Sequence, residues 1–430
     1  MARAASTSAE DAGDDAAPPA PAQPRLPPHR VLALYRFVPI PASDLASLRE
    51  ELGSFLRSAG ARGTILLAPE GVNGTISYPV EEEEEGEDDD AVLRYLRGHR
   101  YFGGDGDGDG DGDGDGDGDG DGDGDGDGDG DGDGGRPIFP LRTRISSSTS
   151  GHVFIRLKIK VKGEIVTLGP QGRGEGGEAE AEAETDAGDG DAPAGGCGGG
   201  GCCELGPVDP LARVGTYVPP GPLWNDLLLD PDVAVIDTRN RYETEIGTFV
   251  NAVDPDTFSF AEFPGWVKKF AKGDGPLPNR KPPRAVAMFC TGGIRCEKST
   301  SYVLSRNLFP PDVPVYHLEG GILGYLATVP RSASLWRGEC FVFDRRVSLG
   351  HGLVPTGTYE ACHGCRRPVS AFDRAGPDYV RGVCCQACRG DLADGQLERF
   401  RERQRQMDRV ERGLAVGPHI HDPGEDVSGA

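Results

Sequence analysis

The amino-terminal third of the chain combines apolar runs typical of strands with spacings typical of helices. Alternating or continuous apolar positions predict strands at 31–40, 63–68, 75–80 and 152–161. Apolar positions three and four residues apart predict helices at 43–59 and 91–101. A turn at 69–74 joins two of the strands, and Gly163 and Glu164 turn the chain after the last one. The order β-α-β-β-α-β indicates an α+β domain of ferredoxin-like type.

The second half follows a different pattern, in which buried strands alternate with helices. Strands are predicted at 232–236, 285–289 and 313–318. Helices are predicted at 222–229, at 297–308 and in a stretch that ends at 329. This alternation indicates a parallel α/β sheet, whose sites lie at the carboxyl ends of the strands. Asp237 and Cys290 both stand at such ends.

Three acidic tracts of low complexity account for the charge of the chain. Fifteen Asp-Gly repeats fill 105–134, and runs with nine and eight acidic residues lie at 81–90 and 175–191. The net charge is −25, and without these tracts the remaining chain has a net charge of +7. The overall acidity therefore does not exclude a nucleic-acid partner. Alternating Asp and Gly cannot bury a core, so we expect the tracts to be disordered.

The most distinctive chemistry follows the strand at 285–289, in the segment Cys290-Thr291-Gly292-Gly293-Ile294-Arg295-Cys296. A cysteine between a strand end and a helix start is surrounded by backbone N–H groups, which favour its thiolate together with the helix dipole. Arg295 adds a positive charge that lowers the thiol pKa further. Gly292 and Gly293 allow the loop to turn tightly. We therefore expect Cys290 to be a reactive thiolate.

The length of this loop separates two kinds of chemistry. A loop of cysteine, five residues and arginine would cradle a phosphate, but Arg295 comes one residue early and Cys296 takes that position. The smaller ring resembles the active-site loop of rhodanese domains, where the cysteine carries a terminal sulfur as a persulfide, so a phosphatase is disfavoured. Asp237, followed by Arg239, is expected to order its own loop or to pair with an arginine rather than to react.

Four basic residues occupy alternate positions along the predicted strand at 152–161 and just after it: Arg156, Lys158, Lys160 and Lys162. Alternate positions of a strand share one face. Such a row is either a solvated face or a surface that follows the phosphates of a nucleic acid, and charge alone does not decide between them.

Two C-x-x-C pairs near the carboxyl end, with nineteen residues between them, predict a structural zinc site formed by Cys362, Cys365, Cys385 and Cys388. Four thiolates around Zn²⁺ would fold a module too small for a core of its own. His363 or Cys384 could replace one ligand, and redox-active thiols without metal are the alternative. No flavin, haem or nicotinamide site is evident.

These features predict an order of segments along the 430 residues. It comprises a disordered leader (1–30), a ferredoxin-like domain (31–170) with acidic insertions (81–90 and 103–136), a disordered linker (171–206), a rhodanese-like parallel α/β domain (207–345), a Cys-rich zinc module (346–395) and a charged tail (396–430). No apolar run approaches the roughly 20 residues that span a bilayer. Acids in the leader fit neither a secretory signal nor a typical transit peptide. We expect a cytoplasmic protein with no membrane partner, with organelle targeting left open.

Eight sequence motifs follow one another along the chain: YRFVPI, GTILLAPEGVNGTI, RLKIKVKGEIVTLG, GTYV, VIDTRNRYETEIGTF, AMFCTGGIRCEKS, VYHLEGGILGYL and LWRGECFVFDRRV. Together they resemble the rhodanese-domain tRNA uridine hydroxylases, from about residue 31 to residue 390 without the insertions and the linker. The resemblance implies an oxygen-dependent enzyme that makes 5-hydroxyuridine at the wobble position of tRNA.

The resemblance also implies roles for individual residues. Cys290 matches the active-site cysteine that carries a persulfide, and Arg295 and the loop glycines match its cradle. Cys296 matches too, either as a resolving thiol or as a packing residue at the helix start. The basic row at 156–162 matches the region that would hold tRNA.

Two alternatives use the same residues. A sulfurtransferase would move sulfur from thiosulfate or a persulfide donor through Cys290. A non-enzymatic scaffold of zinc and rhodanese modules would bind a partner protein, but it leaves the intact cysteine loop unexplained.

Overall fold

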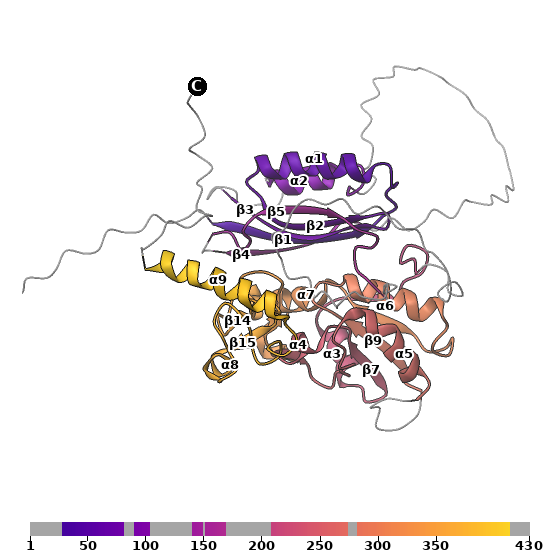
Figure 1. Ribbon diagram of the computed structural model, residues 1–430. Helices are drawn as coiled ribbons and strands as arrows, with labels where there is room; N and C mark the ends of the chain where they lie inside the picture. The colour runs from indigo at the N-terminus through magenta and orange to yellow at the C-terminus, as the bar shows by residue number, and fades with distance from the viewer. Residues whose placement is uncertain are drawn as a thin grey trace, which may run out of the picture.

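The computed structural model describes residues 28–80, 90–103, 140–148, 151–168, 208–273 and 282–412. The predicted leader up to residue 27, most of the acidic insertions, the linker and the end of the charged tail lie outside these residues. Among the described helices, none has the length and apolar character needed to cross a membrane. Figure 1 shows one sheet with two helices stacked on a second, α/β part, and a carboxyl-terminal part that ends in a long helix.

Five strands form the amino-terminal sheet: β1 (His29–Phe37), β2 (Arg62–Ala68), β3 (Gly71–Pro79), β4 (Arg142–Ser148) and β5 (Leu157–Val161). Their order across the sheet is β4-β1-β3-β2-β5. Neighbours are antiparallel, except that β5 runs parallel to β2. Helices α1 (Leu45–Ser58) and α2 (Ala91–Gly98) cover one face of this sheet (Figure 1).

A single apolar core joins the two helices to the sheet. Helix α1 buries four leucines at helical spacing: Leu45, Leu48, Leu52 and Leu56. Helix α2 begins at a capped end, because the Asp90 carboxylate accepts hydrogen bonds from the backbone N–H groups of Val92 and Leu93 at 2.8 and 2.9 Å. Every second residue of β1, β2 and β3 faces this core, so the opposite face of the sheet is left for other contacts.

Two strand predictions in this domain were wrong. The fourth strand is β4, and of the predicted strand at 152–161 only β5 is a strand, added as a fifth one beside β2. The sequence of β4, RTRISSS, contains one apolar residue, Ile145, because its other face meets polar groups of a second domain. The turn at 69–74 is also shorter than predicted, since β3 already begins at Gly71.

The central part is built on a parallel sheet of four strands, as the alternation of strands and helices predicted. Its strands are β6 (Thr216–Val218), β7 (Val233–Asp237), β9 (Ala285–Phe289) and β10 (Val315–Leu318), in the order β6-β10-β9-β7. Helices α3 (Pro222–Leu229) and α7 (Gly321–Thr328) pack on one face, and α5 (Phe263–Ala271) and α6 (Ile294–Ser305) pack on the other. Helix α6 begins three residues before the predicted start at 297.

Several short elements and one long helix, α9, complete the described residues. They are α4 (Arg241–Thr244), β8 (Gly247–Phe249), η1 (Phe260–Glu262), η2 (Arg331–Ala333), β11 (Trp336–Gly338), β12 (Cys340–Phe341), β13 (Ser348–Leu349), η3 (His351–Leu353), β14 (Tyr359–Ala361), β15 (Pro368–Ser370), α8 (Ala371–Ala375) and α9 (Asp394–Glu411). The charged helix α9 starts before the tail boundary predicted at 396. Leu397 and Phe400 of α9 pack against the cysteines of the preceding segment, so its first turns share that small core.

The free face of the amino-terminal sheet lies on the central part. The Tyr35 hydroxyl of β1 donates a hydrogen bond to the Glu297 carboxyl at 2.8 Å. Next along α6, the Lys298 ammonium group lies 2.9 Å from both carboxylate oxygens of Glu70. Arg142 of β4 pairs with Glu319 at 3.0 Å. The helix that follows Cys290 is therefore held by both domains.

Candidate active site and metal centre

Cys290 stands at the carboxyl end of β9, and α6 begins four residues later. The backbone N–H of Gly293 donates to Cys290 Sγ at 3.1 Å. Gly293 has a φ of 108°, and a Cβ at this position would lie 2.7 Å from the Tyr35 hydroxyl oxygen. A glycine is therefore required here by conformation and by space. This arrangement agrees with the cradle expected around the cysteine.

The start of α7 holds the loop from the other side. The backbone N–H groups of Ile322 and Leu323 donate to the carbonyl oxygens of Cys290 and Thr291 at 2.9 and 3.0 Å. This approach requires a glycine at 321, where a Cβ would lie 2.5 Å from the Cys290 carbonyl oxygen. At Gly292, by contrast, a Cβ would meet nothing within 4 Å, so of the two loop glycines only Gly293 meets a steric limit.

The electrostatics of the loop favour an ionised Cys290. Burial opposes the charge, but hydrogen bonds from the Cys296 thiol and backbone and from Gly293, together with the positive Arg295, lower the pKa of Cys290 to about 6. Burial and the negative Cys290 raise the pKa of Cys296, which therefore remains a thiol. Cys296 lies in the first turn of α6 with its Sγ 3.8 Å from the Thr238 hydroxyl, inside the core.

The charge of Arg295 is shared with a carboxylate that the sequence analysis did not identify. The Arg295 guanidinium donates two hydrogen bonds to Glu243, at 2.7 and 2.8 Å, and a weaker one to Thr291 at 3.3 Å. The Glu243 carboxylate therefore partly neutralises the positive charge of Arg295, which we had expected to act on Cys290 in full. Glu243 lies three residues after Asn240, whose backbone N–H donates to its carboxylate at 3.1 Å, a capping arrangement that marks a helix start. From the sequence, this capping pattern could have identified Glu243 as a residue at a helix start, but it does not indicate that Arg295 is its partner.

Asp237 and Arg239 form a second buried ion pair next to the loop. The guanidinium of Arg239 lies 2.9 and 2.7 Å from the two carboxylate oxygens of Asp237, and both side chains are fully buried. Arg239 also donates to the carbonyl oxygen of Gly247 at 2.6 Å. The pairing of Asp237 with an arginine is confirmed. Between them, Thr238 donates to the carbonyl oxygen of Phe289, which ties the loops after β7 and β9 together.

The predicted basic row lies at the far edge of the amino-terminal sheet. Lys158 and Lys160 belong to β5 and are half-buried, whereas Arg156 and Lys162 flank the strand and are exposed. The ladder with β2 continues through both flanking residues, since Gly63 N–H donates to the Arg156 carbonyl and Lys162 N–H to the Leu67 carbonyl. All four residues therefore lie along one extended segment.

Four cysteine sulfurs meet in the carboxyl-terminal part. Those of Cys362, Cys365, Cys385 and Cys388 all lie within 4.8 Å of one another, and we call them the four-cysteine cluster. Neighbouring sulfurs are 3.6, 3.8 and 3.9 Å apart. Tetrahedral Zn–S bonds of about 2.3 Å would place the sulfurs about 3.8 Å apart, so the geometry fits this metal. Cys384 and His363, the alternative ligands, are not part of the cluster; the His363 ring packs on Phe400 instead.

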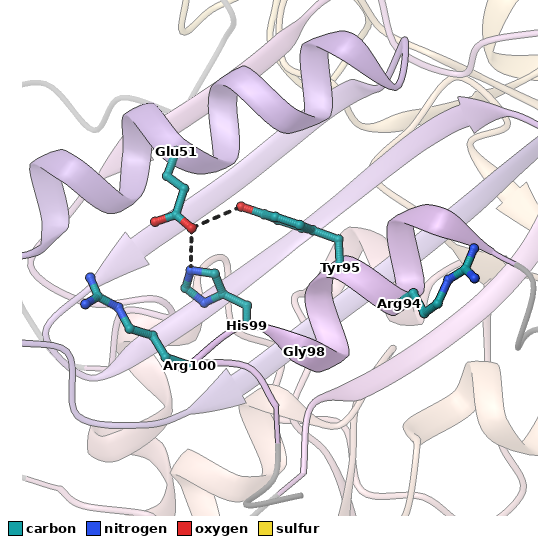
Figure 2. Close-up of a pocket in the computed structure, with 6 residues that line it drawn as sticks. All are labelled: Glu51, Arg94, Tyr95, Gly98, His99 and Arg100. Atoms are coloured by element: carbon teal, nitrogen blue, oxygen red, sulfur yellow. Dashed lines mark hydrogen bonds and ion pairs between the residues drawn. The ribbon is translucent and has the colours of Figure 1, made fainter. Parts of the chain in front are cut away.

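A separate shallow hollow lies on the opposite side of the amino-terminal sheet, between α1 and α2. Figure 2 shows Glu51 between His99 and Tyr95, whose side chains lie 3.3 and 3.4 Å from its carboxylate. Burial lowers the pKa of His99. The amino-terminal sheet lies between these two helices and the central part, as Figure 1 shows, so the hollow does not belong to the Cys290 site.

Comparisons with known proteins bear on the whole chain. Residues 29–104 match the family model described as the UPF0176 acylphosphatase like domain. A tRNA uridine(34) hydroxylase of Caulobacter vibrioides is 38% identical over 381 residues, which cover 88% of this chain and 93% of the relative. One of Mesorhizobium japonicum is 38% identical over 94% of this chain and 99% of its own length. One of Ruegeria pomeroyi is 54% identical over 46% of this chain and 62% of its own.

A solved structure from Rhodopseudomonas palustris, titled a possible tyrosine phosphatase, also matches 22% of this chain and 65% of its own. Its identity of 20% and TM-score of 0.17 carry no argument about fold or function. The relatives with almost complete coverage decide the matter. The chain belongs to the tRNA uridine(34) hydroxylase family.

Proposed function

We propose that this protein hydroxylates uridine 34, the wobble uridine, of tRNA, and that Cys290 is its reactive group. The observation that carries the proposal is the Cys290 thiolate, held by the Gly293 N–H at the start of α6 with a pKa near 6. At neutral pH this sulfur is mostly ionised and so is the nucleophile of the site. The names of the relatives supply the substrate, and sulfur transfer as the main activity is not favoured by them.

The remaining loop residues have supporting roles in this proposal. Thr291 donates a hydrogen bond to Glu243 at 3.3 Å, and Ile294 packs on an apolar cluster that includes Phe37. Gly293 leaves room for the Tyr35 hydroxyl, and Arg295 is aligned by Glu243. Cys296 donates a hydrogen bond to the thiolate, and in this proposal it is either a resolving thiol or a packing residue at the helix start. The family's persulfide chemistry would place the terminal sulfur on Cys290, which implies a sulfur donor as a partner.

The architecture in this proposal is a ferredoxin-like domain followed by a rhodanese-like domain. The order β4-β1-β3-β2 with two helices on one face supports the first assignment, and the parallel sheet with Cys290 at a strand end supports the second. We keep the boundaries 31–170, 207–345 and 346–395. Helix α9 extends the last of these, and zinc at the four-cysteine cluster would hold the module together. The cytoplasm, where tRNA is found, is the proposed compartment.

The basic row at 156–162 is the proposed tRNA contact. Replacing both Lys158 and Lys160 by Ala should weaken tRNA binding and reduce the dependence of affinity on salt by about two phosphate contacts. Filter binding or fluorescence anisotropy over a range of salt concentrations measures this. Replacing Arg94 and Arg97 on α2, on the opposite side of the sheet, provides the matched control. Equal salt dependence in the two double variants would contradict the assignment.

The test of the function is nucleoside mass spectrometry of tRNA. Cells that lack the native gene would carry the native protein, the Cys290→Ser variant or a Cys340→Ala control, in which a buried cysteine outside the loop is removed. We expect 5-hydroxyuridine with the native protein and the control, and none with Cys290→Ser. Unchanged 5-hydroxyuridine in Cys290→Ser would reject the role of Cys290. Absence of the nucleoside with the native protein, together with thiosulfate-dependent sulfur transfer, would indicate a sulfurtransferase.

A further inference from the structure

Two carboxyl groups are buried beside Cys290, and their partners differ in kind. Glu243 is fully buried, and its carboxylate meets the guanidinium of Arg295 in two hydrogen bonds. Glu297 is 3% exposed, and its hydrogen-bond partners are the hydroxyl groups of Tyr35, at 2.8 Å, and Tyr217. A guanidinium stabilises a buried carboxylate, whereas hydroxyl partners in a buried site leave the neutral acid favoured.

The groups around Glu297 come from several elements: Tyr35 from β1, Arg142 from β4, Tyr217 from β6 and Cys290 from the loop. Arg142 is the cation of this group, and it is engaged elsewhere. Its guanidinium pairs with Glu319 at 3.0 Å and lies 4.6 Å from the centre of the Tyr217 ring.

One more titratable side chain, His317 of β10, packs against the Tyr217 ring at 4.2 Å. Burial lowers its pKa to about 3, so it is neutral and adds no charge. Glu297 therefore faces the anionic Cys290, and Arg142, the cation that acts on it, is also paired with Glu319.

Tyr35 connects Glu297 to the cysteine loop. Its hydroxyl donates to the Glu297 carboxyl and lies 2.7 Å from the point that a Cβ of residue 293 would occupy. The N–H of the same Gly293 donates to Cys290 Sγ at 3.1 Å. The hydroxyl thus sits directly over the loop that holds the thiolate, although it belongs to the other domain.

The two acids of this site oppose each other's charge. Burial raises the pKa of Glu297 to about 7, and the negative Cys290 raises it as well, against the lowering effect of the two tyrosine hydroxyls and Arg142. The pKa of Cys290 lies near 6. Two interacting acids with such close values ionise in sequence. Between about pH 6 and pH 7 the sulfur therefore carries the negative charge while Glu297 keeps its proton.

We propose that Glu297 is the proton-holding partner of the Cys290 thiolate, and that Tyr35 of the amino-terminal sheet completes this pair. When Cys290 ionises, its S–H bond breaks, the electron pair stays on sulfur and the proton leaves to solvent, while the Glu297 carboxyl keeps its own O–H bond. In the next step the Glu297 O–H bond breaks and its proton goes to an anion that forms at the loop, which leaves the Glu297 carboxylate. No electrons are transferred, and no further reactant is needed. In this role Glu297 supplies the proton, and Tyr35 is the residue that positions its carboxyl group.

The first test follows the protonation of Glu297 itself in the full-length protein. Infrared difference spectra between the native protein and Glu297→Gln isolate the carbonyl band of the protonated carboxyl. We expect this band to persist to about pH 7. In a Cys290→Ser background it should disappear at lower pH, because the repulsion from the thiolate is gone. In Tyr35→Phe it should persist to higher pH, because a hydrogen bond that favours the carboxylate is gone.

The matched control is Glu70→Gln, which removes the neighbouring contact between the same sheet and α6. It should leave the band unchanged, because Glu70 is paired with Lys298 and is not among the groups that act most strongly on Glu297. A Glu297 band lost in the ordinary pH range of a carboxyl, or one that does not respond to Cys290→Ser, would overturn the proposal.

The second test uses the reaction with tRNA and so rests on the proposed function. We expect Glu297→Gln to lower kcat by about 10²–10⁴-fold, the usual contribution of a placed proton donor, while the ultraviolet titration of the Cys290 thiolate and the thermal unfolding stay native-like. Glu297→Asp should recover part of the rate. If Glu297→Gln does not fold, Tyr35→Phe carries the test through a shift in the alkaline limb of the activity profile.

Full activity and an unchanged pH profile in the folded Glu297→Gln variant would also overturn the proposal. The infrared measurement needs no tRNA. A protein that does not hydroxylate uridine but shows the coupled band would therefore refute the proposed function alone.

Discussion

Cys290 and the four-cysteine cluster place the same functional group, a cysteine sulfur, in two different surroundings. Around Cys290 the nearest polar groups are backbone N–H groups and a single neutral thiol, Cys296. In the cluster, each sulfur has other sulfurs as its nearest partners, at 3.6 to 3.9 Å. The first arrangement stabilises one negative charge without gathering several sulfurs around it. The second brings together four sulfurs whose thiolates would repel one another unless a metal ion neutralises them.

The two sites also differ in the interactions that stabilise them. The Cys290 cradle is fixed by the fold, because β9, α6 and α7 supply its groups and pack in large apolar cores. The four-cysteine cluster has a small core, in which Val369, Val383 and Phe400 are the buried apolar residues other than the cysteines. We therefore expect the fold of this module to depend on a bound metal, whereas the fold of the cradle should not. Four predictions test this comparison between the two sites.

The largest effect should come from removing the metal. Cys362→Ser, or a strong chelator, should remove about one equivalent of zinc and unfold the carboxyl-terminal module, because zinc binding contributes about 10–16 kcal/mol in small modules. Metal analysis and hydrogen exchange of α9 measure this. Cys384→Ser is the matched control, since Cys384 lies outside the cluster and its loss should leave the zinc in place. An ordered α9 in zinc-free protein would show that the module folds by itself.

The next effect concerns the buried pair of Glu243 and Arg295. Glu243→Gln leaves a buried guanidinium without its carboxylate, which should lower the free energy of unfolding by about 3–5 kcal/mol. The pKa of Cys290 should fall further, because Arg295 is then no longer neutralised. Denaturant unfolding and thiolate titration measure the two results. Glu245→Gln, in the exposed pair with Arg241, should change stability by about 0–1 kcal/mol. An equal loss of stability in both variants would show that the buried pair contributes no more to folding than the exposed pair.

A smaller effect separates two glycines of the site. Gly321→Ala places a Cβ 2.5 Å from the Cys290 carbonyl oxygen and requires a φ of 60°, so we expect a loss of about 1–3 kcal/mol and a lower activity. Gly292→Ala meets open space and should change stability by about 0.5 kcal/mol or less. Thermal unfolding of both variants decides this. A larger loss at Gly292 than at Gly321 would contradict the described loop.

The smallest signal is the ionisation of Cys290 with pH. A lowered pKa near 6 means that the thiolate is present above this pH and is lost as the pH falls through it. The ultraviolet difference between the native protein and Cys290→Ser should therefore show one thiolate appearing around pH 6. The metal-bound cluster cancels in this difference. A midpoint near about 8.5, the ordinary value for cysteine, would mean that the cradle does not stabilise the anion.

The sequence predicted those parts of both sites that are contiguous in the chain. The Cys290 loop and the two C-x-x-C pairs are local patterns, and the strand before Cys290 matches β9 residue for residue. Partners from distant segments were missed. Glu243 meets Arg295 from 52 residues away, and Tyr35 meets Glu297 from 262 residues away. The spacing of apolar residues along the chain gives no information about contacts between such distant segments.

The same limitation explains the missed strand β4. Pattern reasoning assumes that one face of a strand is apolar and the other solvated. In β4, Arg142 pairs with Glu319 and Ser146 accepts a hydrogen bond from Arg346, so both faces are covered but one is polar. A strand between an apolar core and a polar domain contact has no simple alternation.

The contacts of α6 with the amino-terminal sheet have an evolutionary consequence. Glu297 and Lys298 are neighbours on the active-site helix, and both reach residues of the other domain, Tyr35 and Glu70. The two domains are therefore not interchangeable modules. A chimera that joins the first domain of one relative to the second domain of another would need both halves of each pair. Recombination between relatives is expected to succeed only where it transfers these pairs together.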